Sequence, residues 1–171
     1  MSTLSAEQVI AALRLEPNQT CGFVAPSYSS ALQLGEGALP DPLESTRPIG
    51  TALYFLLTPA APVRLHRIRN DQLYHYYLGD PVEIVMLLPN GSGERHIVGP
   101  DLLGDQMVQL VIPGGTFHTA RLVGETGWFL GGSTEWPGVV PADVELGDTD
   151  DLVARYPDFE KEIRTFPVPR S

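Results

Sequence analysis

From Thr51 onward the sequence is a series of short segments rich in Val, Ile, Leu, Tyr and Phe, with turn residues between them. The segments are TALYFLLT, VRLHRIR, QLYHYYL, VEIVMLL, RHIV, MVQLVI, TFHTARLV and GWFLGG. Pro-Asn-Gly at 89–91 is a typical hairpin turn, and residues 79–81 and 113–115 are further turns. About eight strands at this spacing predict an all-β sandwich or barrel.

Two of these segments, ALYFLL and IVMLL, are apolar on both faces of the strand. A strand in a sheet with one solvated face alternates between apolar and polar residues. Both faces must therefore be covered, either by a second sheet or by a partner subunit. On this ground we expect a homodimer.

The two ends of the chain have helical patterns instead. Ser5 and Gln8 form a capping-box pattern ahead of an apolar face, which predicts a helix over residues 6–14. Residues 149–165 return to helix, and Pro157 is placed at the first turn of a second short helix. Residues 26–48 are rich in Ser, Gly and Pro, which predicts a long loop with strand fragments.

Composition and charge narrow the function classes. The 171 residues predict a single domain over 1–171, and the net charge of −10 argues against nucleic-acid and membrane-surface partners. One cysteine, Cys21, excludes an internal disulfide and is compatible with a reducing cytoplasm. The first residues lack the basic and apolar regions of a signal peptide, and no apolar run approaches about 20 residues. We therefore expect a cytoplasmic protein with a small-molecule ligand.

Two of the four histidines fall in LHRIRNDQLYHYYLG, residues 65–79, together with an acid, two amides and three tyrosines. In a regular strand Gln72, Tyr74 and Tyr76 share one face, while His75 points to the other. Only a β-bulge would bring Gln72 and His75 into one cavity, and the sequence leaves this open.

The spacing His66-x-Ile68-x3-Gln72-x6-Gly79 resembles the first cupin motif, and PGGTFH, which ends at His118, resembles the second. The resemblance extends to the DUF985 (cupin 5) family along nearly the whole chain. The features that match this family are TALYFLL, His66, Asp71, His75, Gly79-Asp80-Pro81, Trp136-Pro137-Gly138 and the tail DLVARYPDFEKEIR. The resemblance implies a cupin double-stranded β-helix, a jelly-roll barrel with short terminal helices.

The sequence departs from the family at the expected site. The family's His-Pro-Glu-Gly-Gly corresponds to residues 18–22 (NQTCG), and its glutamate after the aspartate is Gln72. Of the usual three histidines and one glutamate, the resemblance leaves His66 and His118, because Ile68 replaces the second histidine. These two with Gln72 are the alternative set of metal ligands, which would hold a divalent transition metal. Because the set lacks an anionic ligand, we expect no cofactor.

Acid/base chemistry without a metal is the main hypothesis. Cupin-fold sugar epimerases use a histidine and a tyrosine to move protons next to a carbonyl, which implies an isomerase- or epimerase-type enzyme here. The expected catalytic residues are His66, His75, Tyr74 and Tyr76. The expected substrate-binding residues are Gln72, His118, Asp71, Cys21 and Arg121. Two alternatives stay open: a metal-dependent cupin enzyme, and a non-catalytic cupin that only binds a small ligand.

Overall fold

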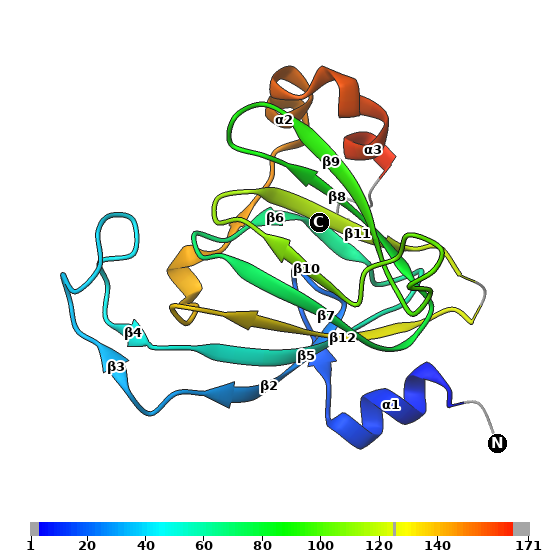
Figure 1. The fold of residues 1–171 in the computed structure, drawn as a ribbon, viewed down its shortest axis with the longest axis horizontal. Helices are drawn as coiled ribbons and strands as arrows, with labels where there is room; N and C mark the ends of the chain where they lie inside the picture. Colours follow the sequence, from blue (N-terminus) through cyan, green and yellow to red (C-terminus); the bar gives the residue numbers. More distant parts are fainter. Residues whose placement is uncertain (1–3, 125, 166–171) are drawn as a thin grey trace.

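The computed structural model describes residues 4–124 and 126–165, and in it two antiparallel sheets face each other (Figure 1). The larger sheet has the strand order β1-β2-β5-β12-β7-β10, and the smaller has the order β13-β6-β11-β8-β9. The strands of the larger sheet are β1 (Glu16–Pro17), β2 (Phe23–Ser29), β5 (Thr51–Leu57), β7 (Gln72–Gly79), β10 (Gln109–Ile112) and β12 (Phe129–Glu135). Those of the smaller sheet are β6 (Val63–Arg67), β8 (Val82–Leu87), β9 (Gly93–Val98), β11 (Phe117–Leu122) and β13 (Glu145–Leu146).

Each of the eight segments predicted after Thr51 contains a strand, so the all-β prediction is confirmed. Residues 26–48, predicted as a loop with strand fragments, begin within strand β2. There β2 pairs with β5, with an irregularity in register between Pro26 and Tyr28. Proline has no amide hydrogen for the ladder, which explains why the sequence pattern alone did not predict this strand.

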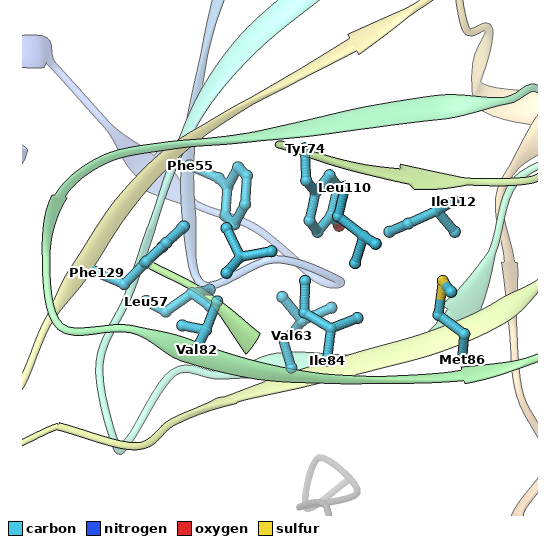
Figure 2. Packing of buried hydrophobic residues seen from close by; sticks show 12 residues of the cluster. Phe55, Leu57, Val63, Tyr74, Val82, Ile84, Met86, Leu110, Ile112 and Phe129 are labelled. Atoms are coloured by element: carbon cyan, nitrogen blue, oxygen red, sulfur yellow. The ribbon is translucent and has the colours of Figure 1, made fainter. Parts of the chain in front are cut away.

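The main core lies between the two sheets. Because successive strand residues point to opposite faces, Phe55 and Leu57 of β5 face inward, as do Val82, Ile84 and Met86 of β8. Figure 2 shows these side chains meeting across the gap between the sheets. The core fills one end of the space, and its Tyr74 marks the boundary with a cavity at the other end.

The outer faces of the sheets are covered by the chain's own helices. Helix α1 (Ala6–Leu13), with the predicted capping box, packs on the outer side of Leu56 and Leu130. Helices α2 (Thr149–Arg155) and α3 (Glu160–Thr165), with the 3₁₀ turn η2 (Pro157–Phe159), pack on Val85 and Leu87. The two-faced strands β5 and β8 are therefore covered within one chain, and the homodimer stays a prediction that needs other grounds. No helix in residues 4–124 or 126–165 is long and apolar enough to cross a membrane.

A two-stranded arm, β3 (Gln33–Leu34) and β4 (Arg47–Pro48), extends from the end of β2 (Figure 1). Arg47 at its base is fully buried and forms an ion pair with Asp143 at 2.8 Å. Asp143 belongs to the 3₁₀ turn η1 (Pro141–Asp143), which lies beside the cavity. The ion pair thus ties the arm to a wall of the cavity.

Candidate functional site

A cavity of 340 Å³ lies between the sheets, at the end that the apolar core leaves open. Its walls come from strands β2, β5, β6, β7 and β12, the loop before β2, and the segment around η1. The lining residues are Asn18, Thr20, Cys21, Val24, Pro26, Tyr28, Ser29, Thr51, Ala52, Leu53, Phe55, His66, Ile68, Gln72, Tyr74, Ser133, Glu135, Val139, Val140, Pro141 and Val144. Its size and its mixture of apolar and polar groups are typical of a site for a small organic molecule.

One row of side chains across three adjacent strands sets the polarity of the cavity. Glu135 on β12 is opposite Thr51 on β5 and opposite Gln72 on β7, and all three line the cavity. The Thr51 hydroxyl donates to Glu135 Oε2 at 2.8 Å, and the Ser133 hydroxyl donates to Oε1. Burial raises the pKa of Glu135, and these two hydrogen bonds oppose the rise. Glu135 is 4% exposed, and it is the only acidic side chain among the described residues that line the cavity.

The Gln72 side chain is next to Glu135 and has no hydrogen-bond partner among the described residues. Gln72 is 5% exposed, and its amide forms no hydrogen bond with any described residue. Its amide atoms are open to the cavity, because among the described residues only Asn70 Oδ1 and Thr116 Oγ1 are fully buried polar side-chain atoms without a partner. An amide that lines a cavity in this state can supply both a donor and an acceptor to a ligand.

The smaller sheet brings His66 and His118 together. They are opposite each other in the β6–β11 pairing, with ring centroids 4.4 Å apart. His66 Nδ1 lies 2.7 Å from the carbonyl oxygen of Arg64, which can only accept a hydrogen bond. The proton of the neutral ring is therefore on Nδ1, so Nε2 is an acceptor. Burial lowers the pKa of His66 to about 4, so this ring is neutral at physiological pH.

His118 is completely buried and is not a lining residue. Its Nε2 lies 2.9 Å from the hydroxyl oxygen of Tyr74, and its Nδ1 lies 3.5 Å from the carbonyl oxygen of Thr116. With the proton on Nδ1, the Tyr74 hydroxyl donates to Nε2. Burial and the nearby His66 lower the pKa of His118, and burial raises the pKa of Tyr74 well above its usual value.

Cys21 enters the cavity on the loop before β2. Asn18 Oδ1 accepts hydrogen bonds from the backbone amides of Thr20 and Cys21 and so fixes the loop. The Cys21 sulfur lies 4.0 Å from His66 Nε2. Burial raises the pKa of the Cys21 thiol to about 11, so the thiol is protonated.

Besides His118, four of the predicted residues lie outside the cavity. His75 and Tyr77 stack on each other, and His75 contacts Thr134 and Gln109, at 2.9 and 3.0 Å. His75 is thus on the opposite face of β7 from Gln72 and Tyr74, as regular strand alternation requires. The bulge in the β7–β12 pairing comes only after His75, between Tyr76 and Leu78.

Tyr76 packs against the apolar core, and its hydroxyl donates to the carbonyl oxygen of Gly79. Asp71 accepts a hydrogen bond from the Gly114 amide at 2.7 Å and so fixes the turn before β11. Arg121 pairs with Glu83. The side chains of Tyr76, Asp71 and Arg121 therefore make their contacts away from the cavity.

The residues present do not fit the alternative metal site. In residues 4–124 and 126–165 there is no group of three His, Cys, Asp or Glu side chains that could hold a metal ion. Both ring nitrogens of His118 already face other groups, Tyr74 and the Thr116 carbonyl. This leaves His66 Nε2 and a neutral amide, Gln72, which are too few ligands and carry no charge.

The sequence interpretation missed Glu135, the acidic residue of the cavity. The sequence pattern that could have predicted it is the strand FLGGSTE, which ends in this acid. In that strand Phe129, Gly131, Ser133 and Glu135 share one face. Strand alternation therefore places an acid on a face that begins with a buried phenylalanine.

Comparisons with known proteins agree with this architecture. A family model described as "Cupin superfamily (DUF985)" matches residues 7–147. The Saccharomyces cerevisiae protein YML079W is 30% identical over 78 residues, which cover 46% of this chain and 39% of the yeast protein.

Two solved structures match almost the entire chain. A hypothetical protein from Leishmania major has a TM-score of 0.87 and 25% identity, covering 97% of this chain and all of that one (100%). Protein SO0799 from Shewanella oneidensis has a TM-score of 0.84 and 26% identity, covering 98% and 100%. The predicted cupin fold is confirmed by these matches and by the family model.

Proposed function

The chain belongs to the DUF985 (cupin 5) family of the cupin superfamily, and on this premise we propose that it is a metal-independent proton-transfer enzyme. In this proposal it isomerises or epimerises a small carbonyl compound inside the cavity. The observation that supports this is the pairing of Glu135 with Gln72. They are an acid with a raised pKa and an unpaired amide, on neighbouring strands and in one cavity.

Glu135 fits the role of proton carrier better than His66 does. A general base works best when its pKa is close to the working pH. Burial moves the pKa of Glu135 upward from 4.5, toward neutrality, and moves that of His66 down to about 4, away from it. In our proposal His66 therefore accepts a hydrogen bond from the substrate, and Glu135 moves the proton.

The proposed step is balanced within the site. The Glu135 carboxylate removes a proton from the carbon next to the carbonyl, and the electron pair of that C–H bond forms the double bond of an enolate. The enolate oxygen accepts a hydrogen bond from the Gln72 amide, which is a preorganised donor. The protonated Glu135 then delivers the proton to the former carbonyl carbon, while the proton of the neighbouring hydroxyl passes to the enolate oxygen. This yields the isomeric carbonyl compound and regenerates the carboxylate.

Hydrogen exchange at carbon tests this proposal. Protein in D₂O is incubated with a panel of ketones, hydroxy ketones and aldoses, and loss of the C–H signal is followed by ¹H NMR. We expect protein-dependent exchange with 2-hydroxyacetophenone and a fall of roughly 10²- to 10⁴-fold in Glu135→Gln. The exposed Glu36→Gln is the matched control and retains the full rate.

A chelator and a binding measurement distinguish the proposal from the metal-dependent and the non-catalytic alternatives. Exchange that is unchanged by EDTA agrees with the proposal, and exchange that EDTA abolishes would favour the metal-dependent cupin. If the panel binds but no member exchanges hydrogen, the protein is a non-catalytic ligand-binding cupin. Wild-type exchange rates in Glu135→Gln would remove Glu135 from the mechanism.

A further inference from the structure

No positively charged side chain is among the described residues that line the cavity. None of its described lining residues is Lys or Arg, and the whole chain has a net charge of −10. The two basic residues that flank the lining His66 have partners elsewhere. Arg64 donates to the carbonyl oxygen of Gln19 at 3.0 Å, and Arg67 pairs with Glu145 at 2.7 Å. A carboxylate or phosphate in this cavity would therefore be desolvated without a cationic partner, which is costly.

The polar atoms that face the cavity are mostly acceptors. His66 Nε2 is an acceptor, because the ring proton is donated to the Arg64 carbonyl oxygen. The protein donor beside it is the Cys21 thiol, a weak donor whose sulfur lies 4.0 Å away. The Tyr74 hydroxyl donates to His118 Nε2, so its oxygen can accept a hydrogen bond from the Cys21 thiol or from a ligand. Glu135 adds carboxyl oxygens at the other side of the same cavity.

The available donors are few. The Thr51 and Ser133 hydroxyls donate to Glu135, and the Thr20 hydroxyl donates to Asn18 Oδ1 at 2.9 Å. Asn18, Tyr28 and Ser29 offer donors only at the exposed rim of the cavity. Among the buried lining residues this leaves the Gln72 amide as the strong donor without a protein partner. A ligand that satisfies this wall must bring its own O–H or N–H donors and needs only one strong donor in return.

The apolar residues of the lining determine which kind of ligand body fits between the polar groups. Val24, Leu53, Phe55 and Ile68 form the walls between the polar groups, with Val140 from the η1 side. Such walls favour a compact apolar body over a densely hydroxylated one, because burying hydroxyls without partners costs free energy.

We propose that the substrate is an uncharged hydroxy-carbonyl compound with a compact apolar body, and that the cavity discriminates against anionic analogues. This inference rests on the proposed function, which supplies the reacting carbonyl group of the substrate. The hydroxyl donates to the acceptor wall of His66 and Tyr74, and the carbonyl oxygen accepts from Gln72. Burial supports this selection because it lowers the pKa of His66 to about 4, which keeps the ring from becoming a cation that could pair with an anion.

Three probes with the same phenyl ketone body test the inference. They are 2-hydroxyacetophenone, propiophenone and phenylglyoxylate, in which the carbonyl carbon carries a hydroxymethyl, an ethyl and a carboxylate group. Dissociation constants are measured at pH 7 by NMR titration of the full chain. We expect the hydroxy ketone to bind about tenfold more tightly than propiophenone, as for one hydrogen bond to a buried acceptor. Phenylglyoxylate should bind most weakly of the three.

A charge introduced at the cavity mouth provides an internal check. Val144 lines the cavity and is 40% exposed, so a longer side chain can reach solvent there. Val144→Lys should tighten phenylglyoxylate binding by about tenfold relative to Val144→Gln, because only lysine adds a charge. The comparison of Lys with Gln separates charge from size and needs no comparison with the wild type.

The possible results separate the inference from the proposed function. If phenylglyoxylate binds wild-type protein as tightly as the hydroxy ketone, or if no probe binds, the inference is wrong. If the hydroxyl gives no advantage over the methyl, the acceptor wall does not select the ligand and the inference also fails. The selective binding pattern without any hydrogen exchange would leave the inference standing and overturn the proposed function. Hydrogen exchange without the selective binding pattern would support the proposed function and overturn the inference.

Discussion

At the scale of single residues, His66 makes stability depend on pH. Above pH 6.5 the ring is neutral in both the folded and the unfolded chain. Between pH 6.5 and about 4 the unfolded chain takes up a proton and the folded one does not, so the free energy of unfolding falls as the pH falls. For His66 alone the loss reaches about 3 kcal/mol. His118, whose pKa is also lowered by burial, adds to it.

Chemical denaturation between pH 7.5 and 4.5 measures this effect. We expect His66→Gln to have a smaller loss of stability toward low pH than the wild type. Glu135 acts in the opposite sense: its raised pKa makes stability fall as pH rises above 4.5, so the comparison with wild type is needed to isolate His66. His96→Gln, in strand β9, is the control, and equal slopes for His66→Gln and wild type would contradict the prediction.

At the scale of elements, the ion pair of Arg47 and Asp143 holds the arm against η1. Both side chains are completely buried, and the Arg47 guanidinium also donates to the Gly138 carbonyl oxygen. Removal of one partner leaves an uncompensated buried charge, so Asp143→Asn should lower the free energy of unfolding by about 3–5 kcal/mol. Urea denaturation measures the loss.

The matched control is Glu145→Gln, which removes the partner of Arg67 in an ion pair that is partly exposed. We expect a loss below about 1 kcal/mol there, because water screens such pairs. Similar losses in the two variants would mean that the arm is not held by this ion pair. Since η1 contributes to the cavity wall, Asp143→Asn should also weaken binding of 2-hydroxyacetophenone.

At the scale of the whole molecule, we propose that the protein is a homodimer. The terminal helices already cover the outer faces of β5 and β8, so the apolar strands are not the reason. Strand β10 instead lies at the edge of its sheet with exposed apolar side chains, Val111 at 57% and, in the preceding loop, Leu103 at 99%. An exposed strand edge with apolar side chains favours association with another chain.

Sedimentation at roughly tens of micromolar should show a dimer, since a stable interface is populated in that range. The double variant Leu103→Lys/Val111→Lys should shift it to a monomer, because two buried ammonium groups would face each other across a symmetric interface. Leu32→Lys, beside the arm, serves as the control, because Leu32 is 68% exposed, a value between those of Val111 and Leu103. A wild-type monomer would contradict the proposal.

Much of the architecture was predictable because it depends on local patterns. The turns and the alternation of apolar residues defined the eight strands after Thr51, and Ser5 with Gln8 defined the start of α1. The motif spacing also placed His66 and His118 in one region, where the structure finds their rings 4.4 Å apart. Each of these features is encoded within a few residues, or within motifs that the family resemblance recognised.

The composition of the cavity was decided by the tertiary structure. Glu135 meets Thr51 and Gln72 only through the register of three strands that are far apart in sequence, and that register is set by packing of both sheets. The side of β7 on which His75 lies depended on whether a bulge occurred before or after it. The pKa values of His66 and Glu135 depend on burial, which the fold as a whole determines. Sequence alone therefore determined the strands and the histidine pair, while the folded chain decided which groups share a cavity and in what state of charge.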